Sequence, residues 1–276
     1  MLSLFLIVNY VILSKKHNQK GRKNIMDFPA LIAHRGLHNE AFPENSMGAF
    51  RNAVFHGLAI ELDVHLTKDC KLVVFHDNSL KRMTGVEAEI EDFTYEQLTA
   101  LKLKDTDEKI PLLSEVLKEV SGKVPLVIEI KEGSPVGVLE KRLDSLMKSY
   151  KGQWCVMSFN PMRVGWFKKN SPDITRGMLL SRHKKKLDFK YIKKYISSFG
   201  IVHNTIASPD FIAYDLRSVT MEVIMDAFSN GCPLLGWTAK NEETLTEALK
   251  FCKSVIFENI PPEKAIEISE IEYKEE

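Results

Sequence analysis

From about residue 30 onward, short apolar runs alternate with longer amphipathic stretches along the chain. This alternation predicts strands that are each followed by a helix, as in parallel sheets that are covered on both faces. Helices fit the stretches between the runs, for example at Ser46–Phe55, Pro161–Lys169 and Tyr191–Ser197. Ser114 is a candidate cap for a helix that carries Val116. The predicted strands are Leu31–Ala33, Ala59–Val64, Leu126–Ile130, Cys155–Phe159, Thr175–Leu180, Phe211–Tyr214, Leu234–Trp237 and Val255–Phe257.

Strand–helix units in this number most simply close into a (β/α)8 barrel of the TIM type, which takes about 250 residues. The chain has 276 residues, 44% of them hydrophobic, which suffices for one such domain at residues 25–276. The net charge of +1 argues against a nucleic-acid partner, because such partners normally require a strongly basic face. The four cysteines are scattered without metal-binding spacing, which favours a reduced compartment.

One further apolar run, Leu72–Phe75, interrupts the rhythm. Only His65–Lys71 separates it from the second predicted strand, whereas a parallel crossover needs about a dozen residues. We therefore expect this run to fold back antiparallel, as a small hairpin inserted after the second strand. Its far end, His76–Asp77, would then reach over the mouth of the barrel. The polar stretch 78–109 that follows is predicted to be an elaborated loop.

Three carboxylates lie toward the carboxyl ends of two predicted strands, where barrels of this type carry their reactive groups: Glu61, Asp63 and Glu129. Glu61 and Asp63 are two residues apart, so on a strand they point to the same face. A ligand set made only of oxygen atoms favours Mg²⁺, Ca²⁺ or Mn²⁺ over zinc. We expect these three side chains to bind a divalent cation, Mg²⁺ or Ca²⁺ in the first place and Mn²⁺ as a further option.

Four basic side chains near the same strand ends suit phosphate chemistry. Arg35 offers a planar fork for phosphate oxygens, and Lys131 offers a point charge. His34 and His76 suit a general acid and a general base, since imidazole titrates nearest to neutral pH. Together with a cation, these residues predict a site that cleaves phosphoesters.

The combination of motifs resembles the glycerophosphodiester phosphodiesterase family, and the likeness extends from Leu31 to about Pro262. Each motif alone is weak, but their order and spacing together are specific. The matching motifs are HRG at His34–Gly36, PENS at Pro43–Ser46, ELD at Glu61–Asp63, VVFHD at Val73–Asp77, IPLLSEVL at Ile110–Leu117, IEIK at Ile128–Lys131, SF at Ser158–Phe159 and WT at Trp237–Thr238.

The resemblance implies a (β/α)8 barrel with a hairpin-bearing insertion and a metal-dependent reaction. The glycerol 2-hydroxyl would attack the phosphorus, and water would open the resulting cyclic phosphate to give sn-glycerol 3-phosphate and an alcohol. The implied roles are metal ligands for Glu61, Asp63 and Glu129, acid–base catalysts for His34 and His76, and phosphate contacts for Arg35 and Lys131. Trp237 is either a wall for the glycerol moiety or a core aromatic residue.

Two other functions stay open from the sequence. The first is hydrolysis of lysophospholipids at the same bond, in the manner of a lysophospholipase D. The second is a non-catalytic, membrane-tethered barrel, which is disfavoured because every expected histidine and carboxylate is present.

Several other residues near the motifs are candidates for supporting roles. Glu44 and Asn45 either order their loop or contact the substrate, and Asp77 is a candidate for orienting a catalytic group. His65 and His203 are expected to be core residues. At the last strand the chain has Glu258–Asn259 where relatives of the family tend to have Thr-Asp, and we expect this pair to affect only substrate binding or packing.

The N-terminus begins with an apolar run, Met1–Leu13, followed by a basic cluster at Ser14–Lys23. The run is shorter than the roughly 20 residues of a spanning helix. A short apolar segment next to basic residues is nevertheless a two-part membrane signal, and the positive charges would stay in the cytoplasm. We therefore predict that residues 1–24 form an anchor and linker for a cytoplasmic catalytic domain, which would be soluble if the anchor does not insert. A second basic cluster at Arg182–Lys186 is expected to be a solvated helix start or a membrane contact.

Overall fold

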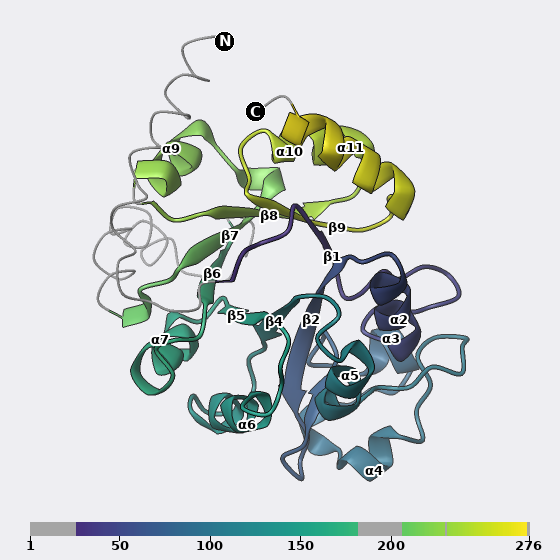
Figure 1. The fold of residues 1–276 in the computed structure, drawn as a ribbon. Helices are drawn as coiled ribbons and strands as arrows, with labels where there is room; N and C mark the ends of the chain where they lie inside the picture. Colours follow the sequence, from purple (N-terminus) through teal and green to yellow (C-terminus); the bar gives the residue numbers. More distant parts are fainter. Residues whose placement is uncertain (1–25, 182–205, 230, 275–276) are drawn as a thin grey trace.

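A closed barrel of eight parallel strands forms the centre of the molecule (Figure 1) in the computed structural model, which describes residues 26–181, 206–229 and 231–274. Neighbouring strands follow chain order, and the ring closes where β1 pairs with both β2 and β9. This arrangement confirms the predicted fold class. The barrel strands are β1 (Leu31–Ala33), β2 (Ala59–Leu66), β4 (Leu126–Ile130), β5 (Trp154–Ser158), β6 (Arg176–Leu180), β7 (Phe211–Asp215), β8 (Leu234–Ala239) and β9 (Ser254–Phe257).

The alternation of side chains along each strand separates two apolar layers. On β2, Ile60, Leu62 and Val64 belong to the large cluster between the strands and the helices, whereas Ala59 belongs to the cluster inside the barrel. The inner cluster is made of residues from all around the ring, and Phe28 packs against it from the segment that precedes β1. Acidic side chains therefore follow apolar ones on the inner face of the same strands, toward their carboxyl ends.

The helices lie outside the strands (Figure 1). Ser46 caps α2 by accepting a hydrogen bond from Ala49 N at 3.1 Å. The predicted cap at Ser114 is wrong, because the backbone N–H of Leu112 donates to Glu115 and the helix begins at Leu113. The C-terminal helix α11 was not expected from the sequence, and the predicted helix at 191–197 lies outside the described residues. The outer helices are α2 (Met47–Phe55), α5 (Leu113–Val120), α6 (Val138–Met147), α7 (Pro161–Asn170), α9 (Met221–Ser229), α10 (Glu242–Leu249) and α11 (Pro262–Lys274), and the short 3-10 helix η3 (Leu216–Ser218) follows β7.

The insertion after β2 contains the expected hairpin. Strand β3 (Leu72–Val74) pairs antiparallel with the end of β2, and Val64 lies opposite Val74. The stretch 78–109, which was predicted to be an elaborated loop, contains the short helices α3 (Lys81–Thr84), η1 (Ile90–Asp92) and α4 (Tyr95–Leu98). Its scattered apolar residues build a small core of their own, made of Val73, Phe75, Leu80, Met83, Ile90, Leu98, Leu103 and Ile110.

The proposed anchor and linker, residues 1–24, lie outside the described residues, so the predicted domain boundary stays a prediction. Among the helices that the structure describes, none combines the length and the apolar character needed to cross a membrane.

Candidate active site

Three carboxylates converge inside the barrel, toward the carboxyl ends of its strands. Glu61 and Asp63 extend from β2 and Glu129 from β4, where Asp63 lies directly beside Glu129 in the strand register. All three residues are buried, and one oxygen from each lies within 4.8 Å of the others. Buried carboxylates at this separation suit a hard divalent cation, so the donor set fits Mg²⁺, Ca²⁺ or Mn²⁺.

The crowding of these acids changes their ionisation. Burial, followed by repulsion from Asp63 and Glu129, raises the pKa of Glu61 well above its ordinary value. Burial would also raise the pKa of Asp63, but the charges of Lys131, His76 and Arg35 outweigh burial and lower it. A bound cation would relieve the repulsion among the three carboxylates.

Arg35 lies beside the carboxylates because the HRG motif turns sharply after β1. Gly36 has φ +79°, and a Cβ there would lie 2.9 Å from the Ala49 Cβ, so this position requires glycine. The turn directs the backbone N–H of Arg35 to Glu61 Oε2 at 2.9 Å. The guanidinium lies 3.6 Å from Asp63.

Lys131 and Asn45 complete the surroundings of the acids. The Lys131 ammonium lies 2.8 Å from Glu129 and 3.2 Å from Asp63. Burial would lower the pKa of Lys131, but these two carboxylates outweigh burial and raise it. Asn45 donates from its side-chain amide to Asp63 Oδ2 at 2.9 Å. Asn45 therefore contacts a predicted metal ligand, a role that the sequence analysis had not assigned to it.

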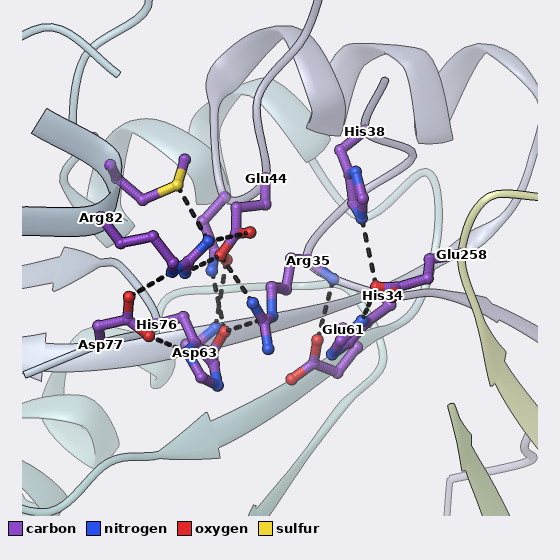
Figure 2. A network of polar contacts seen from close by, with 12 residues as sticks. His34, Arg35, His38, Glu44, Glu61, Asp63, His76, Asp77, Arg82 and Glu258 are labelled. Atoms are coloured by element: carbon purple, nitrogen blue, oxygen red, sulfur yellow. Dashed lines mark hydrogen bonds and ion pairs between the residues drawn. The ribbon is translucent and has the colours of Figure 1, made fainter. Parts of the chain in front are cut away.

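A second network joins the insertion to the HRG loop (Figure 2). Arg82 of α3 donates to both oxygens of Glu44, at 2.7 and 2.8 Å, and to Asp77 Oδ2 at 2.5 Å. Glu44 also accepts a hydrogen bond from Arg35 at 2.7 Å. Asp77 in turn contacts His76 Nδ1 at 2.6 Å, which supports its expected orienting role. Arg82 thus connects Asp77, which contacts His76, with Glu44, which contacts Arg35.

His34 lies across the site from His76 and has a carboxylate partner of its own. Its Nδ1 contacts Glu258 Oε2, which comes from the end of β9. The same carboxylate lies 3.4 Å from His38 Nε2 and 2.5 Å from the Lys240 ammonium. His34, His38 and Glu258 are close enough to share a metal ion, but Lys240 already supplies a positive charge to this carboxylate. Burial lowers the pKa of His34, and burial likewise lowers that of His76.

A cavity of about 730 Å³ opens above these groups. Trp237 and Phe159 form part of its wall, with their rings edge to face and centroids 5.8 Å apart. The Trp237 Nε1 is buried and has no hydrogen-bond partner among the described residues, so it is available to a bound molecule. Seven of the predicted site residues line the cavity: His34, Arg35, Glu61, His76, Glu129, Lys131 and Trp237.

Asp63 is the eighth predicted site residue, and it lies buried in contact with Lys131 and Asn45. The structure thus brings the whole predicted set together. His65 is buried as expected, while His203 and the cluster Arg182–Lys186 lie outside the described residues.

The contacts of Glu258 and Arg82 were not predicted from the sequence. Glu258 was assigned only a role in packing or substrate binding, but it contacts a predicted catalytic histidine. The departure of Glu258–Asn259 from the usual Thr-Asp was the signal that could have indicated this contact. No comparable signal marked Arg82, which lies in a stretch interpreted as a loop.

The model of the glycerophosphoryl diester phosphodiesterase family matches residues 34–260, and the chain belongs to this family. It is 31% identical over 235 residues to a glycerophosphodiester phosphodiesterase of Caldanaerobacter subterraneus, a match that covers 80% of this chain and 89% of the relative. It is 36% identical over 160 residues to a lysophospholipase D of Rattus norvegicus, which covers 53% of this chain and 50% of the relative.

Solved structures share the fold. An Oleispira antarctica phosphodiesterase, solved with the product sn-glycerol-3-phosphate, has a TM-score of 0.71 and 23% identity, covering 87% of this chain and 97% of that one. A Thermotoga maritima glycerophosphodiester phosphodiesterase has a TM-score of 0.66 and 24% identity, covering 88% and 99% of the two chains.

Proposed function

We propose that the protein hydrolyses glycerophosphodiesters to sn-glycerol 3-phosphate and an alcohol. The observation that carries this proposal is the meeting of three buried carboxylates and two imidazoles at one cavity. Membership of the family supports the same reaction. Glu61, Asp63 and Glu129 would hold the cation, for which Mg²⁺ and Ca²⁺ are the first candidates and Mn²⁺ is a further one. A cation bound there would stabilise negative charge on the phosphate oxygens.

The remaining cavity residues suit the other parts of the substrate. Arg35 and Lys131 are the cationic donors nearest to the carboxylates, so we assign them to the phosphate. Trp237 presents an aromatic wall with a buried N–H donor, which suits the small polar glycerol moiety.

The two histidines provide the proton transfers. Each has its Nδ1 against a carboxylate, which leaves Nε2 for the substrate. One imidazole removes the proton of the glycerol 2-hydroxyl as that oxygen bonds to phosphorus. The other donates its proton to the oxygen of the leaving alcohol as the bond between that oxygen and phosphorus breaks. Because the nucleophile belongs to the substrate, it reaches the phosphorus at a high effective concentration.

A cyclic phosphate results, and the two imidazoles then exchange roles. The imidazole that gave its proton takes one from water as the water oxygen bonds to phosphorus. The other returns its proton to the glycerol 2-oxygen as the ring opens, which yields sn-glycerol 3-phosphate.

The test is release of glycerol 3-phosphate from glycerophosphocholine by the full chain in the presence of Mg²⁺, Ca²⁺ or Mn²⁺. We expect His34→Ala and His76→Ala each to lose at least about 100-fold in rate, because general acid–base catalysis contributes about that much or more. An analogue that lacks the glycerol 2-hydroxyl should bind without being cleaved. Turnover of that analogue would contradict the internal nucleophile.

Lysophospholipids are a second substrate class that one finding favours, namely the identity to a lysophospholipase D. Val136, Val138 and Met162, which follow β4 and β5 in the chain, are exposed and could contact an acyl chain. Release of choline from lysophosphatidylcholine micelles, compared with release from glycerophosphocholine, separates the two classes. No release from micelles would remove this alternative.

We also propose that Met1–Leu13 associates with a membrane and leaves the catalytic domain in the cytoplasm. The support is the sequence alone, an apolar run next to a basic cluster. Flotation of the full chain with anionic vesicles, compared with a variant that begins at residue 25, tests this association. If both variants float equally, the segment is not the anchor.

A further inference from the structure

The carboxylate of Glu258 extends the catalytic machinery beyond the expected residues. We propose that Glu258 is a positioning residue that holds the ring of His34 with Nδ1–H toward β9 and Nε2 toward the substrate. The inference rests on the proposed function of His34. Glu258 belongs to none of the family motifs found in the sequence, so the proposal adds a residue to the predicted site.

The geometry places the side chain of Glu258 against the imidazole of His34. The residue follows β9 directly, and its backbone N–H donates to Ala239 O at 3.0 Å, which fixes the start of the side chain. Its Oε2 contacts His34 Nδ1, and its Oε1 lies 2.5 Å from the Lys240 ammonium. The side chain is 10% exposed, so little water competes for these contacts.

The charge of Glu258 determines which nitrogen of His34 carries the proton. Burial would raise the pKa of Glu258, but the hydrogen bonds from His34, His38 and Lys240 outweigh burial and lower it. An ionised carboxylate accepts hydrogen bonds and donates none. Nδ1 of a neutral His34 must therefore carry the hydrogen, and Nε2 presents its lone pair to the cavity that His34 lines.

The other catalytic imidazole has an equivalent partner, which supports this interpretation. Nδ1 of His76 lies 2.6 Å from Asp77 Oδ1. Both imidazoles are thus fixed by a carboxylate at Nδ1 and face one cavity with Nε2. Asp77 is adjacent in sequence to its histidine, whereas Glu258 is 224 residues from His34 and reaches it only because the barrel closes between β9 and β1.

A merely structural role for Glu258 makes a different prediction. The carboxylate also joins the loops of His38 and Lys240, so it could act as a clamp between the β1, β8 and β9 ends. In that case, removing Lys240 should impair the enzyme about as much as removing Glu258. If Glu258 positions His34, removing Lys240 leaves the imidazole in place, because Lys240 contributes less than His34 and His38 to keeping Glu258 ionised. Lys240→Met is therefore the matched control.

The kinetic test compares Glu258→Ala, Glu258→Gln, Lys240→Met and His34→Ala in the full chain with glycerophosphocholine and Mg²⁺. We expect Glu258→Ala to lower kcat about 30-fold to 100-fold while KM changes less than about threefold. Glu258→Gln should fall between Ala and the wild type, since its amide oxygen can still accept from Nδ1. Lys240→Met should stay within about threefold of the wild type.

Two kinetic outcomes would overturn the proposal: a kcat of Glu258→Ala near that of the wild type, or equal losses in Glu258→Ala and Lys240→Met. Activity in His34→Ala would instead show that the proposed role of His34 is wrong. The ring nitrogens of wild-type His34, seen by long-range ¹H–¹⁵N NMR and assigned by their loss in His34→Gln, provide a readout that does not require Glu258→Ala to fold. A protonated Nδ1 in the neutral ring supports the proposal, and a protonated Nε2 refutes it.

Discussion

Glu44 links the insertion to the active site through charge, and replacing it with glutamine tests that link. In the folded protein the carboxylate accepts hydrogen bonds from Arg35 and from two nitrogens of Arg82. Burial would raise the pKa of Glu44, but these arginines outweigh it and lower the pKa from 4.5 to about 2. Only 12% of the side chain is exposed, so solvent screens the interaction weakly.

The difference in pKa translates into folding free energy. A carboxyl whose pKa is about 2 in the folded state and 4.5 in the unfolded chain contributes roughly 3 kcal/mol at neutral pH. Because the folded pKa of Glu44 is the lower one, this contribution is fully present above pH 4.5 and is lost as the pH falls toward 2. At pH 3.5 roughly 2 kcal/mol should remain.

Urea unfolding of wild type and Glu44→Gln at pH 7 and pH 3.5 measures this contribution. The difference in unfolding free energy between the two proteins should be largest at pH 7 and smaller by roughly 1 kcal/mol at pH 3.5. Other acids titrate in both proteins, so the comparison isolates Glu44. A difference that is the same at both pH values would refute the assigned charge interaction. We also expect a lower kcat/KM for the variant, because Arg35 loses a partner that holds it.

Three further changes probe separate parts of the structure. Arg163→Met should cost about 3–5 kcal/mol in urea unfolding because it leaves the buried Glu140 without its partner at 2.6 Å, and adding Glu140→Leu should recover part of the loss. Trp237→Phe should raise KM severalfold with little loss of stability, since the indole N–H has no partner to lose among the described residues; an unchanged KM would place Trp237 outside the substrate site. Asp77→Asn should lower kcat about tenfold or more, because it weakens the contact that orients His76; unchanged steady-state rates would contradict that role.

The barrel could be predicted from the sequence because its signals are local. Each strand is a short apolar run of its own, and the run Leu72–Phe75 was too close to its predecessor for a parallel crossover. The same holds for Glu61 and Asp63, whose spacing places them on one face of a strand. In each case a few neighbouring residues suffice to determine the structure.

The contacts of Glu258 and Arg82 could not be predicted in this way. Glu258 meets His34 across the closure of the barrel, and Arg82 meets Glu44 across an insertion whose apolar residues are too scattered to show a period. Such pairs depend on how loops from different strands fold over the mouth. The insertion was misjudged for the same reason, since its small core forms only when separate short helices pack together.

The central claim, cation-dependent hydrolysis of a glycerophosphodiester, is tested most directly by one titration. The full chain is treated with chelator, and release of glycerol 3-phosphate from glycerophosphocholine is followed as Mg²⁺, Ca²⁺ or Mn²⁺ is added back. We predict no release without added ion, restoration by at least one of the three ions, and no restoration in Glu129→Gln. Full activity in the presence of chelator, or equal restoration of Glu129→Gln, would contradict the account.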